Sequence, residues 1–454
     1  MTTPIVDFVR RYAQSGTARL HMPGHKGQSL LGCEPWDITE IRGADELYEA
    51  EGIIAQSEAN ATRLFGTAHT YYSTEGSSQC IRAMLCLALQ GAPRTGKRPV
   101  LLAARNAHKA LLYAAALLDF DIWWLWPAPE DTGALCSCPV TVQALSTALE
   151  ELAGQGRTPF GVYLTSPDYL GGMQDIAALS AVCDAQGVPL LVDNAHGAYL
   201  RFLPGGSRHP IDLGAAVCCD SGHKTLPVLT GGAYLHLGPK APVQEESTVR
   251  SALALFGSTS PSYPVMASLD LCRAWLEEEG QKAFQTLERR VGAVKKLAAA
   301  KGLGIPEGLT DPVRITLNTA KIGLTGQKAA QGFRECGVEP EYADDGFVVL
   351  IPSPFNTEEE FLRVERAIES MPVGAPLAIG RRIPPVSGQA VSPRKAVLSP
   401  SEEVPMNLAV GRIAARAACP CPPGVPVVMP GEVISEKAAE FLIRYGFSSA
   451  KVLK

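Results

Sequence analysis

Short apolar runs alternate with helix-like segments between residues 99 and 220, and this alternation limits the folds open to the chain. The runs have the length and composition of buried strands, while the segments between them space their apolar residues as helices do. The expected strands cover residues 99–104, 121–126, 161–165, 188–192 and 215–219. The expected helices cover residues 110–118, 141–153 and 177–185. Strands that alternate with helices form βαβ units, so we predict an α/β domain on a mostly parallel sheet.

Chemically active side chains follow these strands one after another. They belong to His108, Asp168, Asp193, His196 and Lys224. Ligands of open α/β sheets bind at the carboxyl ends of the strands. One polar residue at such an end is easily a coincidence, but repetition strand after strand favours a ligand site.

Lys224 and Asp193 suggest which ligand this is. Lys224 lies just past the strand 215–219, beside Ser221 and His223. Most lysines are solvated surface charges, but an amine in this position suits a Schiff base with a carbonyl, and desolvation makes it more nucleophilic. Asp193 ends the strand 188–192. A Schiff-base lysine and an aspartate for a pyridinium nitrogen are the two anchors of pyridoxal phosphate.

Two further segments have both an ordinary and a functional interpretation. Gly76, Ser77 and Ser78 precede a helix expected over residues 79–90. Free N–H groups and the helix dipole suit a phosphate there, although an ordinary serine N-cap has the same pattern. The loop at residues 19–27 carries His25 and Lys26. It is either a solvated turn or a loop that closes over an anionic or carbonyl ligand.

Composition excludes several classes of protein. A length of 454 residues predicts two or three domains, and a net charge of -5 gives no reason to expect nucleic acid or an anionic membrane as partner. No apolar run reaches the roughly 20 residues of a membrane helix, and no signal peptide is evident, so we expect a cytoplasmic protein. The 12 cysteines lack metal-binding spacing, so we expect reduced thiols and no metal.

Several motifs together carry a resemblance to a known family. They are His-Met-Pro-Gly-His-Lys (21–26), Asp-Ile-Thr-Glu (37–40), Arg-Asn-Ala-His-Lys (105–109), Asp-Asn-Ala-His-Gly-Ala (193–198), Ser-Gly-His-Lys-Thr-Leu-Pro (221–227), Pro-Pro-Gly (422–424) and Pro-Gly-Glu (430–432). In this order, over nearly the whole chain, they resemble the bacterial Orn/Lys/Arg decarboxylases, pyridoxal phosphate enzymes of the aspartate-aminotransferase fold (fold type I). Ser-Gly-His-Lys is shared with other enzymes of that fold, whereas the first and last motifs are more restricted.

The resemblance implies a domain organisation. A large α/β domain with a mostly parallel seven-stranded sheet would be followed by smaller α+β parts. We expect an N-terminal arm that contributes to the active site at 1–55, the cofactor-binding domain at 56–300, a small α+β domain at 301–375 and the family's C-terminal segment at 376–454. A long helix over residues 265–300 would connect the domains, and Thr357 with Glu360 predicts a capping box in the small one.

The resemblance also implies roles for residues. Lys224 would hold the cofactor, Asp193 would face the pyridine nitrogen, and His108 would stack on the ring. The other expected cofactor contacts are Gly76, Ser77, Ser78, His196, Ser221 and His223, with His223 also counted as catalytic. In a homodimer, Thr259 and Ser260 would reach the neighbouring cofactor phosphate. The expected substrate-side residues are His25, Lys26 and Glu432.

The implied activity is α-decarboxylation of arginine, lysine or ornithine to CO2 and an amine for polyamine biosynthesis, with the choice of substrate open. Two positions depart from the family pattern. Glu75 replaces an asparagine, and its carboxylate would repel a phosphate unless it points away; Cys421 replaces a tyrosine. The sequence also lacks the extra N-terminal domain of the longer members, so their decameric assembly is not assumed, and the expected assembly is a homodimer or a higher homo-oligomer with shared active sites.

Three other functions compete with this one. An aminotransferase needs an arginine clamp for the substrate carboxylate. Arg314 is the candidate, although we expect it to be a solvated strand residue. A cysteine desulfurase needs a cysteine on a mobile loop, whereas Cys336 falls at a helix end. A non-catalytic homologue would explain Glu75 and Cys421, but the intact Lys224 and Asp193 argue against it.

Overall fold

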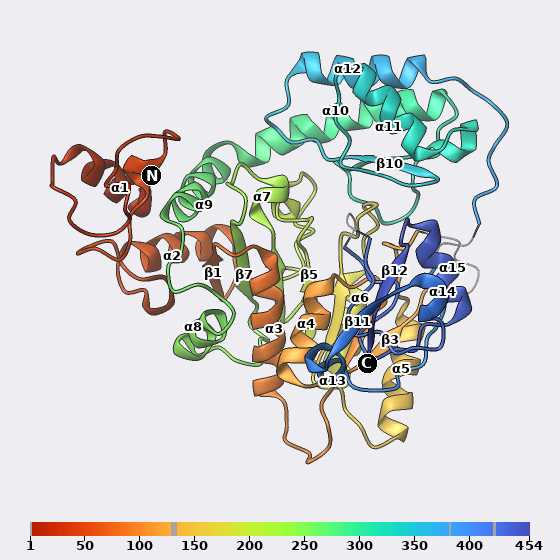
Figure 1. Cartoon of the computed structure of the whole chain (residues 1–454). Helices are drawn as coiled ribbons and strands as arrows, with labels where there is room; N and C mark the ends of the chain where they lie inside the picture. The colour runs from red at the N-terminus through yellow and green to blue at the C-terminus, as the bar shows by residue number, and fades with distance from the viewer. Residues whose placement is uncertain (1, 129–133, 381–382, 421–423) are drawn as a thin grey trace. The chain divides into compact units, whose positions relative to one another are not determined.

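The structure is a computed structural model that describes residues 2–128, 134–380, 383–420 and 424–454 (Figure 1). It divides into two compact units. Unit 1 comprises Met1–Arg94, Phe160–Val162 and Ile176–Phe284; unit 2 comprises Thr95–Pro159, Tyr163–Asp175 and Gln285–Lys454. In the described part of the chain, no helix combines the length and apolar character needed to cross a bilayer.

The described residues form a seven-stranded sheet with the order β1-β7-β6-β5-β4-β2-β3. Its strands are β1 (His69–Ser73), β2 (Val100–Ala104), β3 (Asp121–Leu125), β4 (Val162–Thr165), β5 (Leu190–Asp193), β6 (Val217–Asp220) and β7 (Ala233–Leu237). β2 pairs in parallel with β3, and β5 in parallel with β6. β7 is antiparallel to both of its neighbours, β6 and β1. The prediction of a mostly parallel seven-stranded sheet is confirmed.

Local composition explains most of these strands. Every residue of β2, β5, β6 and β7 is buried. Strands buried on both faces read as continuous apolar runs, and this is why the sequence located them to within a few residues. β1 was missed because its sequence, His-Thr-Tyr-Tyr-Ser, is polar and aromatic.

Unit 1 surrounds its strands with helices that buried carboxylates help to hold. The helices are α1 (Pro4–Gln14), α2 (Ile53–Phe65), α3 (Ser77–Gly91), α6 (Ile176–Ala185), α7 (Gly222–Thr225), α8 (Glu246–Ala254) and α9 (Tyr263–Trp275). Asp270 on α9 accepts hydrogen bonds from the N–H groups of Ile5 at 3.0 Å and Val6 at 3.2 Å. A buried carboxylate thus satisfies the first N–H groups of α1 and ties it to α9.

Unit 2 contains the small α+β part. Its helices are α4 (Lys109–Leu118), α5 (Val142–Gly154), α11 (Gly326–Glu335), α12 (Glu358–Ser370), α13 (Pro393–Leu398), α14 (Met406–Ala409), α15 (Glu436–Arg444) and α10 (Gln281–Ala300), which begins in unit 1. A π-helical turn at Leu276–Gly280 joins α9 to α10, so the helix predicted over 265–300 is interrupted. β8 (Ile315–Asn318), β10 (Phe347–Leu350) and β9 (Tyr342–Ala343) form an antiparallel sheet.

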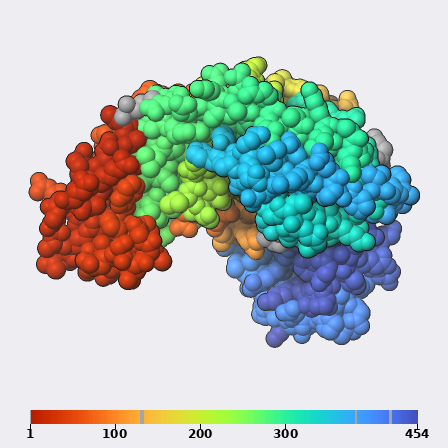
Figure 2. Space-filling model, turned by 90° about the horizontal axis from the view of Figure 1, so that it is seen from above, coloured from red at the N-terminus to blue at the C-terminus, as the bar shows by residue number. Residues whose placement is uncertain are grey.

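α11 and α12 lie side by side next to this small sheet, and both reach the surface of the unit (Figures 1 and 2). The predicted capping box begins α12. The Thr357 hydroxyl accepts from the Glu360 N–H at 3.3 Å, while the Glu360 carboxylate accepts from the Thr357 N–H at 2.7 Å. Two N–H groups at the helix start are therefore satisfied reciprocally.

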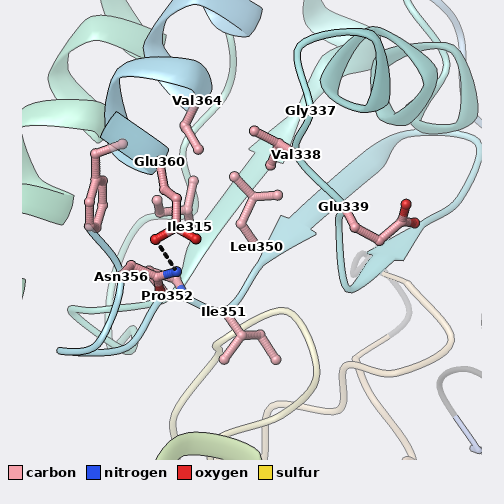
Figure 3. A pocket seen from close by; sticks show the side chains of 11 residues that line it. Ile315, Gly337, Val338, Glu339, Leu350, Ile351, Pro352, Asn356, Glu360 and Val364 are labelled. Atoms are coloured by element: carbon pink, nitrogen blue, oxygen red, sulfur yellow. Dashed lines mark hydrogen bonds between the residues drawn. The ribbon is translucent and has the colours of Figure 1, made fainter. Parts of the chain in front are cut away.

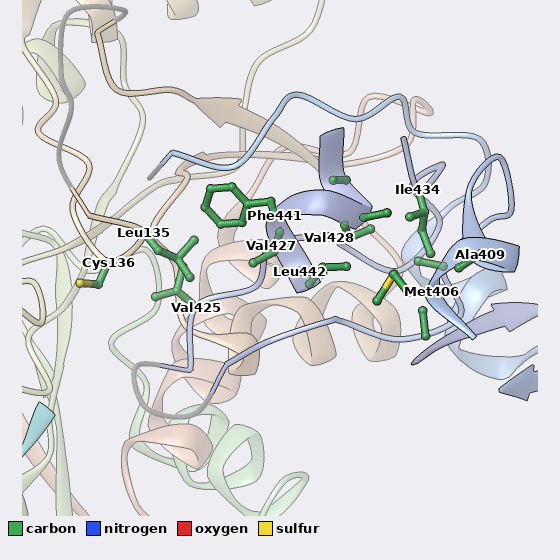
Figure 4. Packing of buried hydrophobic residues seen from close by; sticks show 14 of the residues in the cluster. Leu135, Cys136, Met406, Ala409, Val425, Val427, Val428, Ile434, Phe441 and Leu442 are labelled. Atoms are coloured by element: carbon green, nitrogen blue, oxygen red, sulfur yellow. The ribbon is translucent and has the colours of Figure 1, made fainter. Parts of the chain in front are cut away.

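The C-terminal segment packs in a hydrophobic cluster that also includes Leu135, Cys136 and Val349 from earlier parts of unit 2 (Figure 4). Val425, Val427 and Val428 meet Phe441 and Leu442 of α15 there. β11 (Ser401–Pro405) and β12 (Ser449–Leu453) pair antiparallel beside it. The sequence missed this pair because β11 is Ser-Glu-Glu-Val-Pro and mostly exposed.

Two neighbours on α15 provide a test of this core. Leu442 is 0% exposed, whereas Ile443 is 56% exposed. Leu442→Ala should lower the free energy of unfolding by about 2–5 kcal/mol because it leaves a cavity. Ile443→Ala should change it by no more than about 0.5 kcal/mol. Urea unfolding followed by tryptophan fluorescence measures both, and equal effects would contradict this packing.

Candidate active site

The parallel pairing of β5 with β6 brings two polar strand ends together within unit 1. Asp193, the last residue of β5, lies opposite Cys219 of β6. β6 ends one residue later, at Asp220, and α7 begins almost at once with Gly222. The short helix carries His223 and Lys224, so register and chain direction place the Asp193 and Lys224 segments side by side.

Lys224 is held by a histidine from the segment that follows β5. Its Nζ lies 3.2 Å from Nε2 of His196. His196 is buried at 6% exposure, whereas Lys224 is exposed. The imidazole can exchange a proton with the amine across this short distance.

Asp193 is buried and fixed by its own backbone turn. Its side chain is 3% exposed, and Oδ1 accepts a hydrogen bond from the Ala195 N–H at 3.1 Å. The Cys219 thiol lies 3.8 Å from the same oxygen. A carboxylate fixed in this way can present one orientation to a cationic partner.

Ser221 and His223 form a second polar pair beside Lys224. Ser221 Oγ lies 3.3 Å from Nδ1 of His223, which is also 3.3 Å from the carbonyl oxygen of Gly232. Burial lowers the pKa of His223, partly offset by the Gly232 carbonyl, and the nearby Lys224 charge lowers it further. A neutral imidazole at neutral pH can donate or accept here.

The turn before α3 carries the residues predicted to bind the phosphate. Gly76 is its N-cap residue with φ 71°, and no side chain caps the first turn. The Gly76 N–H donates to the Gly231 carbonyl at 2.7 Å, and a Cβ on Gly76 would meet no heavy atom within 4 Å. Ser77 and Ser78 are half-buried, and Glu75 is exposed. The positive end of a 15-residue helix thus faces open space beside serine hydroxyls.

The other predicted residues of unit 1 lie in loops. His25 Nε2 lies 3.1 Å from the Asp37 carboxylate, and the Lys26 ammonium donates to the His21 carbonyl at 2.5 Å. Thr259 and Ser260 are exposed, and the Ser260 N–H donates to Ser258 Oγ at 3.2 Å. Their proposed contacts with substrate or cofactor stay predictions.

His108 belongs to unit 2, where the C-terminal segment lies against it. It is the N-cap of α4, and its Nδ1 accepts from the Ala110 N–H at 3.3 Å. The Lys109 N–H donates to the Gly424 carbonyl at 3.2 Å, and a Cβ on Gly424 would come within 3.0 Å of the His108 ring. A glycine at 424 therefore allows the close approach. Cys421 lies outside the described residues.

A buried arginine holds the same C-terminal segment. Arg105 is 2% exposed and donates to the carbonyls of Pro426 at 2.7 Å and Val427 at 2.9 Å. Its guanidinium also faces the rings of Trp124 and Trp126. Glu432, predicted on the substrate side, is 3% exposed and accepts from the Met429 N–H at 2.8 Å. Burial raises the pKa of Glu432, while the Arg105 charge opposes this rise.

The prediction of a solvated Arg314 is wrong. Arg314 is 2% exposed, lies 3.6 Å from the Asp311 carboxylate and donates to the Tyr169 carbonyl at 3.2 Å. Burial raises the pKa of nearby Asp168 to about 6, although its backbone donors and the Arg314 charge lower it. The Arg314 guanidinium can be buried because the nearby carboxylates and the Tyr169 carbonyl supply counter-charge and a hydrogen-bond acceptor. Cys336 lies at the C-terminal end of α11, as predicted.

Unit 2 also contains a cavity of about 230 Å³ between β8, β10 and α12 (Figure 3). Its floor is apolar, with Ile315, Leu350 and Val364. The Asn356 amide donates to Glu360 at 3.4 Å, and Glu339 pairs at 2.8 Å with Arg334, which lies outside the lining, so these polar side chains already have partners. Its described lining has no lysine or histidine, and it therefore does not suit a carbonyl cofactor.

The donor set of unit 1 fits pyridoxal phosphate. Lys224 offers an amine for its aldehyde, Asp193 a buried carboxylate for its ring nitrogen, and the start of α3 an open helix end for its phosphate. These are the three chemical groups that the cofactor presents to proteins.

Comparison with known proteins agrees with this chemistry. The model of the Orn/Lys/Arg decarboxylase major domain matches residues 3–307, and that of the family's C-terminal domain matches residues 385–449. The chain belongs to the Orn/Lys/Arg decarboxylase family. It is thus a pyridoxal phosphate-dependent decarboxylase.

Relatives of this decarboxylase extend along almost its whole length. A *Bacillus subtilis* protein named YaaO is 28% identical over 98% of this chain and 94% of its own. The arginine decarboxylase of *B. subtilis* is 26% identical over 97% of this chain and 93% of its own. The structure of *Escherichia coli* constitutive lysine decarboxylase aligns with a TM-score of 0.80 at 18% identity, covering 100% of this chain and 82% of its own. This structural likeness supports the fold type I architecture.

Sequence reasoning missed a buried polar group behind the site of the decarboxylase. Asp220 is 0% exposed and bonds Asn194, His209 and His236. Two signals were visible: an aspartate at the last position of an apolar strand, and a histidine inside the apolar run that became β7. Neither identifies its partners, because they come from distant segments.

The assignment of Lys224 can be tested chemically. Borohydride treatment of the cofactor-loaded protein should attach a pyridoxyl group to Lys224, since its amine is exposed and lies beside His196. Peptide mass spectrometry locates the adduct, and Lys224→Ala should carry none. An adduct on Lys26 or Lys109 would overturn the assignment.

Proposed function

We propose that this decarboxylase removes the α-carboxyl group of a basic amino acid, with arginine as the first candidate, and releases CO2 and the corresponding amine, a polyamine precursor. The observation that carries the proposal is the contact of Lys224 with His196. These two residues follow β6 and β5, the paired strands, and β5 ends at Asp193. Arginine comes first because three Bacillus relatives that match over nearly the whole chain are named arginine decarboxylase.

In this proposal the chain's residues hold the cofactor and direct protons. Bound pyridoxal phosphate supplies an electron sink for bond cleavage at Cα. Lys224 would hold the cofactor covalently until the substrate amine replaces it. His196, 3.2 Å from Lys224 Nζ, would take up and return the lysine proton during this exchange. The buried carboxylate of Asp193 would keep a proton on the ring nitrogen, which strengthens the electron sink.

The phosphate would lie at the start of α3. Gly76, Ser77 and Ser78 contribute N–H groups and hydroxyls, and the helix end contributes partial positive charge. Ser221 and His223 would complete this side. Glu75 is exposed, so its carboxylate has room to point towards solvent instead of the phosphate. His108, as ring-stacking residue, and His25, Lys26 and Glu432, as substrate-side residues, are parts of the same proposal.

An aminotransferase activity receives no support from the described residues. Its arginine clamp needs a guanidinium that can bind the substrate carboxylate. Arg314, the candidate from the sequence, is buried beside Asp311 and Asp168. Withdrawing it from both carboxylates would leave buried charges without their counter-charge, which typically costs 3–5 kcal/mol.

Substrate and mechanism are tested together by measuring CO2 and amine release from arginine, lysine and ornithine. We expect turnover of at least one, with arginine best. Asp193→Asn should retain cofactor yet lose roughly 100-fold or more in kcat, since a neutral amide no longer holds the ring-nitrogen proton. Absorbance titration of the cofactor verifies loading. Near-normal kcat in Asp193→Asn would mean that this residue does not serve the ring nitrogen.

We also infer that the active enzyme is a homodimer in which the exposed loop Ser258–Ser260 serves the partner's phosphate site. Lys224→Ala and the double variant Thr259→Ala/Ser260→Ala should each be inactive. In a mixed dimer, one site would carry both changes and the other neither. Because random reassociation makes about half the dimers mixed, roughly a quarter of wild-type CO2 release should return. No recovery, with mixed dimers verified by differential tags, would place the loop elsewhere.

A further inference from the structure

A line of buried polar side chains crosses four neighbouring strands of unit 1. The hydroxyl oxygen of Thr70 on β1 lies 2.9 Å from Nδ1 of His236 on β7. Nε2 of His236 lies 3.2 Å from Asp220 at the end of β6. Asp220 in turn accepts from the Asn194 amide at 2.6 Å, and Asn194 directly follows β5. The line thus ends one residue from Asp193.

Asp220 is the centre of this line. Its Oδ1 binds Asn194, while its Oδ2 lies near Nε2 of both His236 and His209, the latter at 3.1 Å. All four residues are 0% exposed. Although burial alone would raise it, the pKa of Asp220 is held below its usual range by the two histidines. The carboxylate is therefore ionised and accepts from three donors.

A metal site is the rival interpretation of this group. One ligand atom each from His209, Cys218 and Asp220 lies within 4.8 Å of the others. However, the imidazole nitrogens face the Asp220 oxygen at hydrogen-bond distance, and Nδ1 of His209 has no partner among the described residues. A metal-bound histidine usually donates its other ring N–H to a neighbour. The geometry favours a hydrogen-bonded hub, in which the Asp220 carboxylate accepts from Asn194, His209 and His236.

We propose that Asp220 is a positioning residue that fixes the spacing between Asp193 and Lys224 and so prepares the chain for its cofactor. The proposal rests on the assignment of the cofactor to these two residues under the proposed function. Asp220 does not itself contact the reacting groups; it acts through Asn194 on one side and through the turn into α7 on the other.

The connections on each side of Asp220 are short. Asn194 is the residue after Asp193. Its side-chain amide donates a hydrogen bond to Asp220, and its backbone N–H donates to the Cys219 carbonyl at 3.0 Å. On the other side, Ser221 follows Asp220 directly, and Lys224 lies three residues after Ser221, in the short helix α7. A shift between these strand ends would change where the cofactor's aldehyde and ring nitrogen meet their partners. Misplacement by about 1 Å can reduce turnover roughly 100-fold.

Asp220→Asn tests the proposal. An amide has one accepting oxygen and a donating NH2 group, so it cannot accept from Asn194, His209 and His236 together. We expect the dissociation constant for pyridoxal phosphate, measured by absorbance titration of the apoprotein, to rise about tenfold or more. We expect kcat to fall more than KM changes, and the imidazole 15N NMR signals of His209 and His236 to shift.

Glu58→Gln is the matched control. Glu58 is another buried carboxylate of unit 1, 4% exposed, that binds Arg250 at 2.8 Å and the Tyr72 N–H at 2.9 Å. The Glu58→Gln substitution should lower the melting temperature without changing cofactor affinity. If Asp220→Asn also lowered only the melting temperature, Asp220 would be a purely structural residue and the proposal would be wrong.

A second variant covers the case in which Asp220→Asn does not fold. Asn194→Ala removes one bond of the hub and leaves both histidines on Asp220, so it should weaken cofactor binding in the same direction but less. Unchanged affinity in Asn194→Ala would overturn the proposal. Metal analysis of the purified holoenzyme decides the rival interpretation: one zinc ion per chain, lost in Asp220→Asn, would replace the hub with a metal site.

These outcomes are independent of the proposed substrate. If none of the three amino acids released CO2 but Asp220→Asn still weakened cofactor binding, the positioning role would stand and the proposed substrate class would fail. If wild-type turnover were normal while both hub variants bound cofactor as wild type does, the positioning role alone would fail.

Discussion

The parallel pairing of β5 with β6 is the constraint on which the candidate site depends. With Asp193 opposite Cys219, the residues after both strands must share one edge of the sheet. A slip of one residue would turn every side chain of a strand to the opposite face. All residues of both strands are buried, so such a slip would move each side chain into space that is packed for another and would take Asp193 and Asp220 away from their buried donors. The contact between Lys224 and His196 therefore follows from packing well outside the site.

Buried carboxylates fix the geometry around this sheet. Asp220 on β6 bonds His236 on β7 and Asn194 after β5, Asp270 holds the first turn of α1, and Glu58 joins α2 to Arg250 on α8. Each is surrounded by donors, because an ionised group without them is costly in a low-dielectric interior. Such groups add little net stability compared with apolar packing. Their effect is directional: each permits few arrangements of the segments that it joins.

The sequence predicted the parts of the fold that local patterns encode. Continuous apolar runs located β2, β5 and β6, and Thr357 with Glu360 located the start of α12. β11 and β12 escaped because an exposed, charged strand depends on pairing with a segment more than 40 residues away. Arg314 was misjudged for a similar reason, since Asp311 and Asp168 compensate its burial only in the folded chain. The strand-end residues were predicted, but the hub at Asp220 required tertiary structure to identify.

The exposure of the candidate site bears on how it works. Decarboxylation is favoured where the substrate carboxylate is stripped of its hydrating water, because the CO2 that leaves is uncharged and loses little by it. In the single chain Lys224 is exposed, and so are Thr259 and Ser260. The Asp220 hub can fix the strand ends next to Asp193 and Lys224, but its residues are buried and it does not itself cover the exposed lysine. In the homodimer that we propose, a second chain would bring its loop at 258–260 to the cofactor phosphate and would help to cover the site. In this proposal, positioning by the buried network and desolvation by a partner are separate contributions, and a homodimer would supply the second without altering the first.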